Sequence, residues 1–189
     1  MKCLSLFILI LMLSYGTLHA QEITKQEKGY FNLTELGYFF SSNQTNMPMI
    51  GGSARQKYGA YALSLRNING LFITNNVSLG VGVGLDGYTF KMSESIYDNT
   101  FLLFGDVRYY LKNERNTFFG YGDFGSSVAI DDNIANGLFF DLGLGYKFKI
   151  SNRTGMSVSM GYNRQNINHD QSSIKENYSS FTVKLGLVF

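Results

Sequence analysis

The sequence predicts an all-β fold, a closed antiparallel up-and-down β-barrel of about eight strands. Three observations support this prediction. The last nine residues, FTVKLGLVF, place apolar side chains at every second position, as in a strand whose two faces differ. About eight segments of roughly ten residues have a similar pattern. Long polar connections between these segments alternate with short ones, as expected when consecutive strands run in opposite directions.

The predicted strands cover residues 29–40, 57–73, 77–90, 100–111, 117–129, 137–149, 155–164 and 178–189. The clearest pattern is at 77–86, where an apolar residue alternates at every step with serine, glycine or aspartate. The segment at 138–148 repeats this design. The first two segments are less regular, because polar residues at 32–35 interrupt the alternation in one and Asn69-Gly70 predicts a β-bulge in the other.

The first twenty residues predict a cleaved secretory signal peptide. Lys2 precedes an apolar stretch at residues 4–13, and smaller and more polar residues follow up to Ala20. The predicted division is therefore a signal peptide at 1–20, a short segment at 21–28 and the barrel at 29–189. The single cysteine, Cys3, lies ahead of the apolar stretch, so we expect a mature protein without thiols or disulfides.

The chain carries few charges, and their sum is small. There are 16 Lys and Arg against 14 Asp and Glu, a formal net charge of +2, and charged residues make up 16% of the chain against roughly 25% in soluble domains. Without a basic run or a strong net charge, we expect no nucleic-acid partner. Apolar stretches after the signal are diluted by Gly, Ser or Asp, which argues against a helical membrane span. Any membrane crossing would therefore use strands.

The predicted connections differ in length in a regular way. Long polar connections cover residues 41–56, 91–99, 130–136 and 165–177, and short turns cover 74–76, 112–116 and 150–154. The only proline, Pro48, lies in the first long connection, where it would remove no hydrogen bond from the sheet. This alternation predicts that the four loops gather at one end of the barrel, where they are the candidate sites for an external ligand.

The composition of the polar face decides which side of the wall points inward. It combines Gly and Ser with nine charged residues, which are Glu35, Arg66, Asp86, Asp106, Arg108, Asp123, Asp141, Lys147 and Lys184. Small residues and paired opposite charges suit the narrow interior of an eight-stranded barrel, whereas a soluble barrel would carry many Lys and Glu outside. We therefore predict a transmembrane barrel with a polar network inside, and a soluble exported barrel is the alternative. Aromatic residues near strand ends, including Tyr88, Tyr110 and Tyr178, are predicted to form girdles at the membrane surfaces.

The closing strand carries a family resemblance. Phe181, Val183, Leu185, Leu187 and the terminal Phe189 share one face. This pattern resembles the last strand of Gram-negative outer-membrane β-barrels, and residues 29–189 resemble the small barrels of the OmpX and OmpA type. The resemblance implies an outer-membrane location amid lipid and lipopolysaccharide, periplasmic turns and a periplasmic segment at 21–28. It also implies that the barrel-assembly machinery recognises these five residues.

No motif in the chain predicts a catalytic residue, a cofactor or a metal site. The pattern G-x-G-x-x-G occurs at 82–87 and 120–125, but no helical pattern follows either stretch, so we interpret these glycines as spacers within strands. His169 invites comparison with outer-membrane lipid A deacylases, whose His and Ser lie two residues apart, but here that position is Gln171. The oxygen-bearing side chains of Asp131, Asp132 and Asn133 lack the ligand spacing of a calcium-binding loop.

These observations predict a closed barrel with a structural role or a loop-mediated binding or adhesion role at the cell surface, and not an enzyme. One alternative is a lipid A-modifying hydrolase that uses His169. The other is a narrow channel, because polar groups at membrane depth often mark ion paths. We prefer the closed barrel because buried opposite charges are expected to pair, and because eight strands leave room only for side chains.

Overall fold

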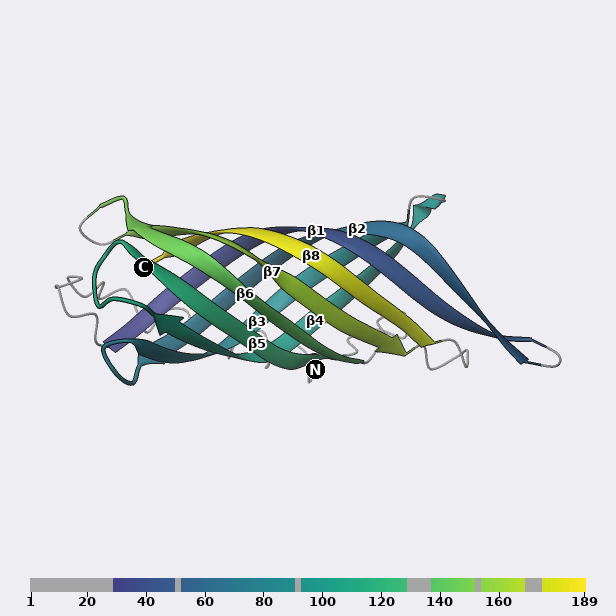
Figure 1. The fold of residues 1–189 in the computed structure, drawn as a ribbon, viewed down its shortest axis with the longest axis horizontal. Coiled ribbons are helices and arrows are strands. Elements are labelled where there is room, and N and C mark those ends of the chain that lie inside the picture. The colour runs from purple at the N-terminus through teal and green to yellow at the C-terminus, as the bar shows by residue number, and fades with distance from the viewer. Residues whose placement is uncertain (1–28, 50–51, 91–92, 129–136, 152–153, 169–174) are drawn as a thin grey trace, which may run out of the picture.

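Eight antiparallel strands, each paired with its neighbours in the chain, close into a barrel because the last strand pairs with the first (Figure 1). The computed structural model describes residues 29–49, 52–90, 93–128, 137–151, 154–168 and 175–189. The strands are β1 (Gly29–Met49), β2 (Gly52–Phe72), β3 (Val77–Phe90), β4 (Ser93–Tyr110), β5 (Thr117–Val128), β6 (Gly137–Lys149), β7 (Gly155–Asn168) and β8 (Lys175–Val188). Within these residues, no helix is long and apolar enough to cross a membrane. The predicted all-β barrel is confirmed.

The register of the eight strand pairs sets the tilt of the barrel. Starting at Gly29, successive paired residues are Phe72, Ser78, Arg108, Tyr121, Gly143, Gly161, Thr182 and finally Phe39. One circuit therefore returns to β1 ten residues beyond its starting point. Such a stagger requires strands that are tilted by about 35–45° to the barrel axis. The tilt brings together side chains from strands that are not neighbours.

Several predicted loops are in fact strands. β1 continues to Met49 and β2 begins at Gly52, so most of the predicted loop at 41–56 is a paired hairpin, and Pro48 lies opposite Ser53 in it. β4, β7 and β8 likewise extend into the predicted loops at 91–99 and 165–177. The prediction was wrong because alternation of apolar residues marks only the part of a strand with an apolar face. Backbone pairing continues through polar residues. The loop at 130–136 lies outside the described residues.

The connections after β2 and β4, at 73–76 and 111–116, are short, as predicted. After β2, the backbone N–H groups of Ile73 and Thr74 donate to the carbonyl oxygen of Val77 at 2.9 and 3.2 Å. The expected bulge at Asn69-Gly70 is absent, because both residues are regularly paired with Asn32 and Phe31. Gly70 is explained by packing instead, since a Cβ atom there would collide with the Phe31 ring. The described strands shift register between Thr89 and Phe90.

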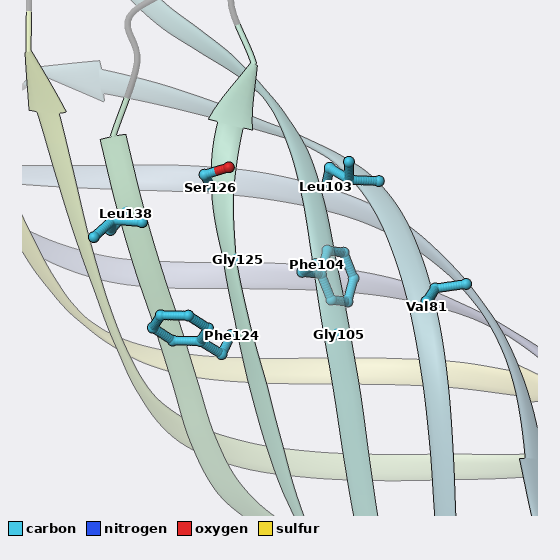
Figure 2. Close-up of a pocket in the computed structure, with 8 residues that line it drawn as sticks. All are labelled: Val81, Leu103, Phe104, Gly105, Phe124, Gly125, Ser126 and Leu138. Atoms are coloured by element: carbon cyan, nitrogen blue, oxygen red, sulfur yellow. The ribbon is translucent and has the colours of Figure 1, made fainter.

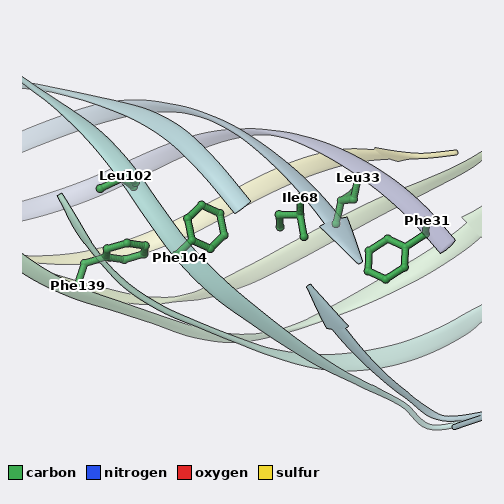
Figure 3. Close-up of a cluster of buried hydrophobic side chains, with 6 residues drawn as sticks. All are labelled: Phe31, Leu33, Ile68, Leu102, Phe104 and Phe139. Carbon is green, nitrogen blue, oxygen red and sulfur yellow. The ribbon is translucent and has the colours of Figure 1, made fainter. Parts of the chain in front are cut away.

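Apolar side chains also fill part of the barrel interior. Figure 3 shows one cluster along the inner wall, formed by Phe31, Leu33, Ile68, Leu102, Phe104 and Phe139. A second cluster contains Phe39, Ala60, Ala62, Tyr88 and Tyr178, and a third contains Tyr110, Phe119 and Tyr121. Because β1 and β3 rise from the short-turn end, the second cluster lies toward the hairpin end of the barrel and the third toward the turns.

Candidate functional site: a charged interior and an apolar outer wall

The nine charged residues predicted to point inward all lie in the barrel interior. Their relative exposures range from 0% to 4%. They come from seven of the eight strands, all except β7, and each alternates with outward-facing neighbours on its strand. Charges at this depth are stable only when opposite charges and hydrogen bonds surround them. The contacts within the cluster therefore determine what the interior can do.

Arg66 on β2 joins three carboxylates from three other strands. Its guanidinium nitrogens lie 3.0 Å from Asp86, 3.2 Å from Asp123 and 3.0 Å from Asp141. Ser64 extends this contact, because its hydroxyl donates to Asp86 at 2.5 Å and accepts from Arg66 Nε at 3.1 Å. The rings of Phe39, Phe104 and Phe139 lie 5.3–5.6 Å from the guanidinium carbon and keep water away from it.

Two further cations complete the ion-pair cluster. Arg108 contacts Glu35 at 3.0 Å and Asp106 at 2.9 Å. Lys184 is held less closely: its Nζ lies 3.4 Å from Glu35, 3.5 Å from Asp123 and 3.3 Å from Asp141. Its Nζ also lies 3.9 Å from the centroid of the Tyr121 ring. The tilt of the strands thus links residues from β1, β5, β6 and β8 in one network.

Three carboxylates lie side by side on neighbouring strands, so cations are needed between them. Asp106 pairs in register with Asp123, and Asp123 pairs with Asp141, so neighbouring strands present adjacent carboxylates on the same face. Like charges at such positions repel each other. Arg66 and Lys184 each bridge Asp123 and Asp141 and offset this repulsion.

Lys147 occupies a different place from the other eight charged residues. Its Nζ lies 4.7 Å from the ring centroid of Tyr110 and 5.9 Å from that of Phe72, near the short turns. Aromatic faces attract a cation, which accounts for its burial there. The sequence placed Lys147 on the inward face but carried no signal for this separate aromatic environment.

Three tyrosines that were expected in the girdles point inward. Tyr88 and Tyr178 are fully buried, and Tyr110 is 5% exposed. The Tyr88 hydroxyl donates to Gln165 at 2.9 Å, and Gln165 donates to Thr100 at 3.0 Å. The girdle prediction used their position near strand ends and was wrong for these three. Their spacing from inward-facing charges was the better signal, because residues two apart on a strand point to the same face. Tyr88 follows Asp86 by two residues, and Tyr110 follows Arg108 by two.

The outer wall is apolar. Its most exposed large side chains include Leu144 at 71%, Val81 at 67% and Phe124 at 66%. The five terminal-strand residues of the predicted assembly signal also point outward, and they are Phe181, Val183, Leu185, Leu187 and Phe189. Figure 2 shows a shallow apolar groove on this wall, where Gly105 and Gly125 leave space between larger side chains such as Leu103 and Leu138.

The remaining motifs of the sequence do not form a site in the described residues. Both G-x-G-x-x-G stretches lie within strands, β3 and β5, and neither leads into a helix. A Cβ at Gly84 would approach Arg66 Cγ to 2.9 Å, so this glycine makes room for the arginine. No group of three metal-ligating side chains occurs in the part of the chain that the structure describes. His169 and residues 131–133 lie outside that part.

The comparisons with known proteins agree with this architecture. No family model matches the chain, and no curated protein matches it significantly. The outer membrane protein OprG from Pseudomonas aeruginosa has a similar structure, with a TM-score of 0.51 and 12% identity over 87% of this chain and 98% of OprG. The outer membrane protease OmpT from Escherichia coli aligns with a TM-score of 0.48 and 9% identity over 85% of this chain and 96% of OmpT. The likeness to OprG concerns the fold. The chain thus has the fold of a small outer-membrane β-barrel.

Proposed function

We propose that this protein is an integral outer-membrane β-barrel with a closed lumen and a structural or binding role at the cell surface. The observation that carries the proposal is the reversal of ordinary burial, with charged side chains inside and large apolar side chains outside. In water such a wall would favour aggregation, whereas a lipid bilayer is its natural solvent. Lipid and lipopolysaccharide would surround the wall, and the assembly machinery would recognise the terminal strand.

The long hairpin of β1 and β2 supports a role in binding. It projects beyond the other strands at one end of the barrel (Figure 1). β2 pairs with β1 from Gly52 onward but with β3 only from Ala60 onward. Within the described residues, positions 52–59 thus have one backbone edge without a neighbouring strand. Such an edge can accept an added strand from another protein. We infer that an extended segment of an extracellular protein binds there.

Site-specific labelling tests the location and the orientation. A cysteine replaces either Ile50, which lies between β1 and β2 in the sequence, or Asn113 in a short connection, and intact cells are treated with a membrane-impermeant maleimide. We expect labelling of the Ile50→Cys protein alone, with Asn113→Cys labelled only after the outer membrane is opened. Labelling of Asn113→Cys on intact cells would contradict the orientation, and recovery of the protein in the soluble fraction would contradict the membrane location.

Shortening the hairpin tests the binding role. Residues 44–57 are replaced by Asn-Gly, which forms a two-residue hairpin turn. Vesicles that carry the full-length protein should adhere to at least one member of a panel of immobilised extracellular-matrix proteins, and the shortened protein should lose this adhesion while keeping its folded gel mobility. Replacement of the turn at 112–116 by Gly-Ser residues is the matched control. Adhesion that survives the shortening would contradict the hairpin as the binding element.

A further inference from the structure

One region of the apolar outer wall is polar. Tyr30, Asn32 and Thr34 on β1 and Asn67 and Asn69 on β2 form a group that we call the amide patch. These residues point outward, because they alternate with the buried side chains of Phe31, Leu33 and Glu35 on β1 and of Arg66 and Ile68 on β2. The polar residues at 32–35 that disturb the strand pattern in the sequence include two members of this patch.

The amide patch lies toward the short-turn end of β1 and β2, with exposed apolar residues on both neighbouring strands. In the sheet, Asn69 is paired with Val81 and Asn67 with Val83, and Thr34 is paired with Leu187. Val81, Val83 and Leu187 are exposed by 67%, 39% and 43%. Apolar residues therefore flank the patch on both neighbouring strands. If the wall faces lipid, these amides stand at membrane depth.

Hydrogen bonds within the patch satisfy most of its polar atoms. The amide nitrogen of Asn32 donates to Asn67 at 3.2 Å and to Asn69 at 2.9 Å, and that of Asn67 donates to Asn32 at 3.2 Å and to Thr34 at 2.9 Å. Asn69 donates one N–H to Asn67 at 3.0 Å, and the Tyr30 hydroxyl donates to Asn69. The network thus holds β1 and β2 together on the outside.

Two donors and three acceptor oxygens of the patch are left over. Within the described residues, the second N–H of Asn69 and the hydroxyl hydrogen of Thr34 have no acceptor. The oxygens of Asn32 and Thr34 each accept one bond out of two, and the hydroxyl oxygen of Tyr30 accepts none there. Acyl chains offer no hydrogen-bonding groups, so these atoms favour a polar partner at membrane depth.

We propose that the amide patch is the interface through which two copies of this chain associate side by side in the membrane. The patch has no charge to repel its own copy, and it carries both spare donors and spare acceptors. Self-complementarity of this kind is what a two-fold symmetric interface requires. The exposed side chains of Leu36, Leu65 and Leu71 around it can pack against those of the second copy. The inference rests on the proposed membrane location.

Cross-linking in vesicles tests this interface. Residues 21–189 contain no cysteine, so Val81→Cys beside the patch provides a unique thiol. The control is Leu144→Cys, which is similarly exposed, at 71% against 67%, but lies on β6 across the barrel from β2. The protein is refolded into dilute phosphatidylcholine vesicles and treated with a bifunctional maleimide. We expect a cross-linked dimer for Val81→Cys and almost none for Leu144→Cys.

A second variant tests the amides themselves. Replacing Asn32, Asn67 and Asn69 by Leu in the Val81→Cys protein should lower the dimer yield about tenfold. Leucine suits a lipid-facing wall, so the folded gel mobility should persist. Equal yields for the two cysteine variants, or an unchanged yield after the triple substitution, would overturn the interface. A wild-type chain that inserts and is monomeric overturns this inference alone, whereas a chain that fails to insert overturns the membrane location as well.

Discussion

Arg66 compensates three buried carboxylates at once, those of Asp86, Asp123 and Asp141. The substitution Arg66→Met keeps most of the side-chain volume but leaves these acids with too few cations. We expect the folded barrel to lose about 3–5 kcal/mol of stability, the usual cost of breaking a buried pair. The measurement is urea unfolding in vesicles followed by circular dichroism. The control Arg164→Met, at an exposed position, should change stability by no more than about 1 kcal/mol. Equal effects of the two substitutions would contradict this role of Arg66.

Glycines on the two faces should respond differently to alanine. A Cβ at the inward Gly82 would approach three ring atoms of Phe104, all closer than 3.0 Å, whereas the nearest atom to a Cβ at the outward Gly105 lies 3.9 Å away. Gly82→Ala should therefore cost about 1–3 kcal/mol by overpacking, and Gly105→Ala should be close to neutral. Chemical unfolding of both variants under the same conditions checks the difference. A neutral Gly82→Ala would show that the interior is loosely packed.

At the scale of single residues, the sequence predicts which face of a strand a side chain points to better than it predicts which residues that side chain contacts. The alternation of side chains between the two faces of a strand was enough to place Glu35 and Arg66 on the inward side. It was not enough to show that Arg66 on β2 meets Asp141 on β6, because that contact crosses the barrel between strands that have three other strands between them and depends on the ten-residue stagger. The same alternation places Tyr88 inside. The girdle prediction for Tyr88 was wrong because it relied on position near a strand end instead.

The closing strand β8 places its apolar residues in the apolar outer wall. Leu185 is the middle one of its five outward residues and is paired with Leu36 on β1 and Val158 on β7. Leu185→Lys should destabilise the barrel by about 2–4 kcal/mol, the cost of a lysine facing the middle of the bilayer. Leu185→Met is the matched control and should be tolerated. The fraction of protein with folded gel mobility after refolding into vesicles measures the effect. Equal fractions for both variants would place Leu185 away from lipid.

At the scale of whole strands, the sequence predicted which segments form strands but not how long each strand is. β3 and β6 were predicted at their observed bounds because apolar residues alternate over most of their length, at 77–86 and 138–148. The hairpin of β1 and β2 was missed from Ser41 onward because the sequence at 41–46 and 52–57 is mostly polar and has no apolar alternation. Such a segment is held by backbone hydrogen bonds between paired strands, which leave no trace in side-chain polarity. The paired register at Met49 and Gly52 is visible only in the structure.

The whole molecule combines an ion-pair cluster with apolar layers on either side of it. Phe39, Tyr88 and Tyr178 lie toward the hairpin end, and Tyr110 and Phe119 lie toward the turns. Between them, five carboxylates face the three cations Arg66, Arg108 and Lys184, while Lys147 lies apart near the turns, so neither sign forms a continuous ring along the axis. Ion conduction needs a hydrated path with sites that bind weakly. The filled interior is therefore expected to support the wall and to exclude ions.

Planar-bilayer recording tests this central claim most directly. Purified protein that is refolded and shown to be folded by its gel mobility is inserted into a lipid bilayer in symmetric salt, and current is recorded under an applied voltage. The closed, filled barrel predicts no steady single-channel conductance, because about eight strands leave an interior that side chains occupy. Reproducible single-channel steps from the wild-type protein would contradict the closed lumen and would favour a narrow channel.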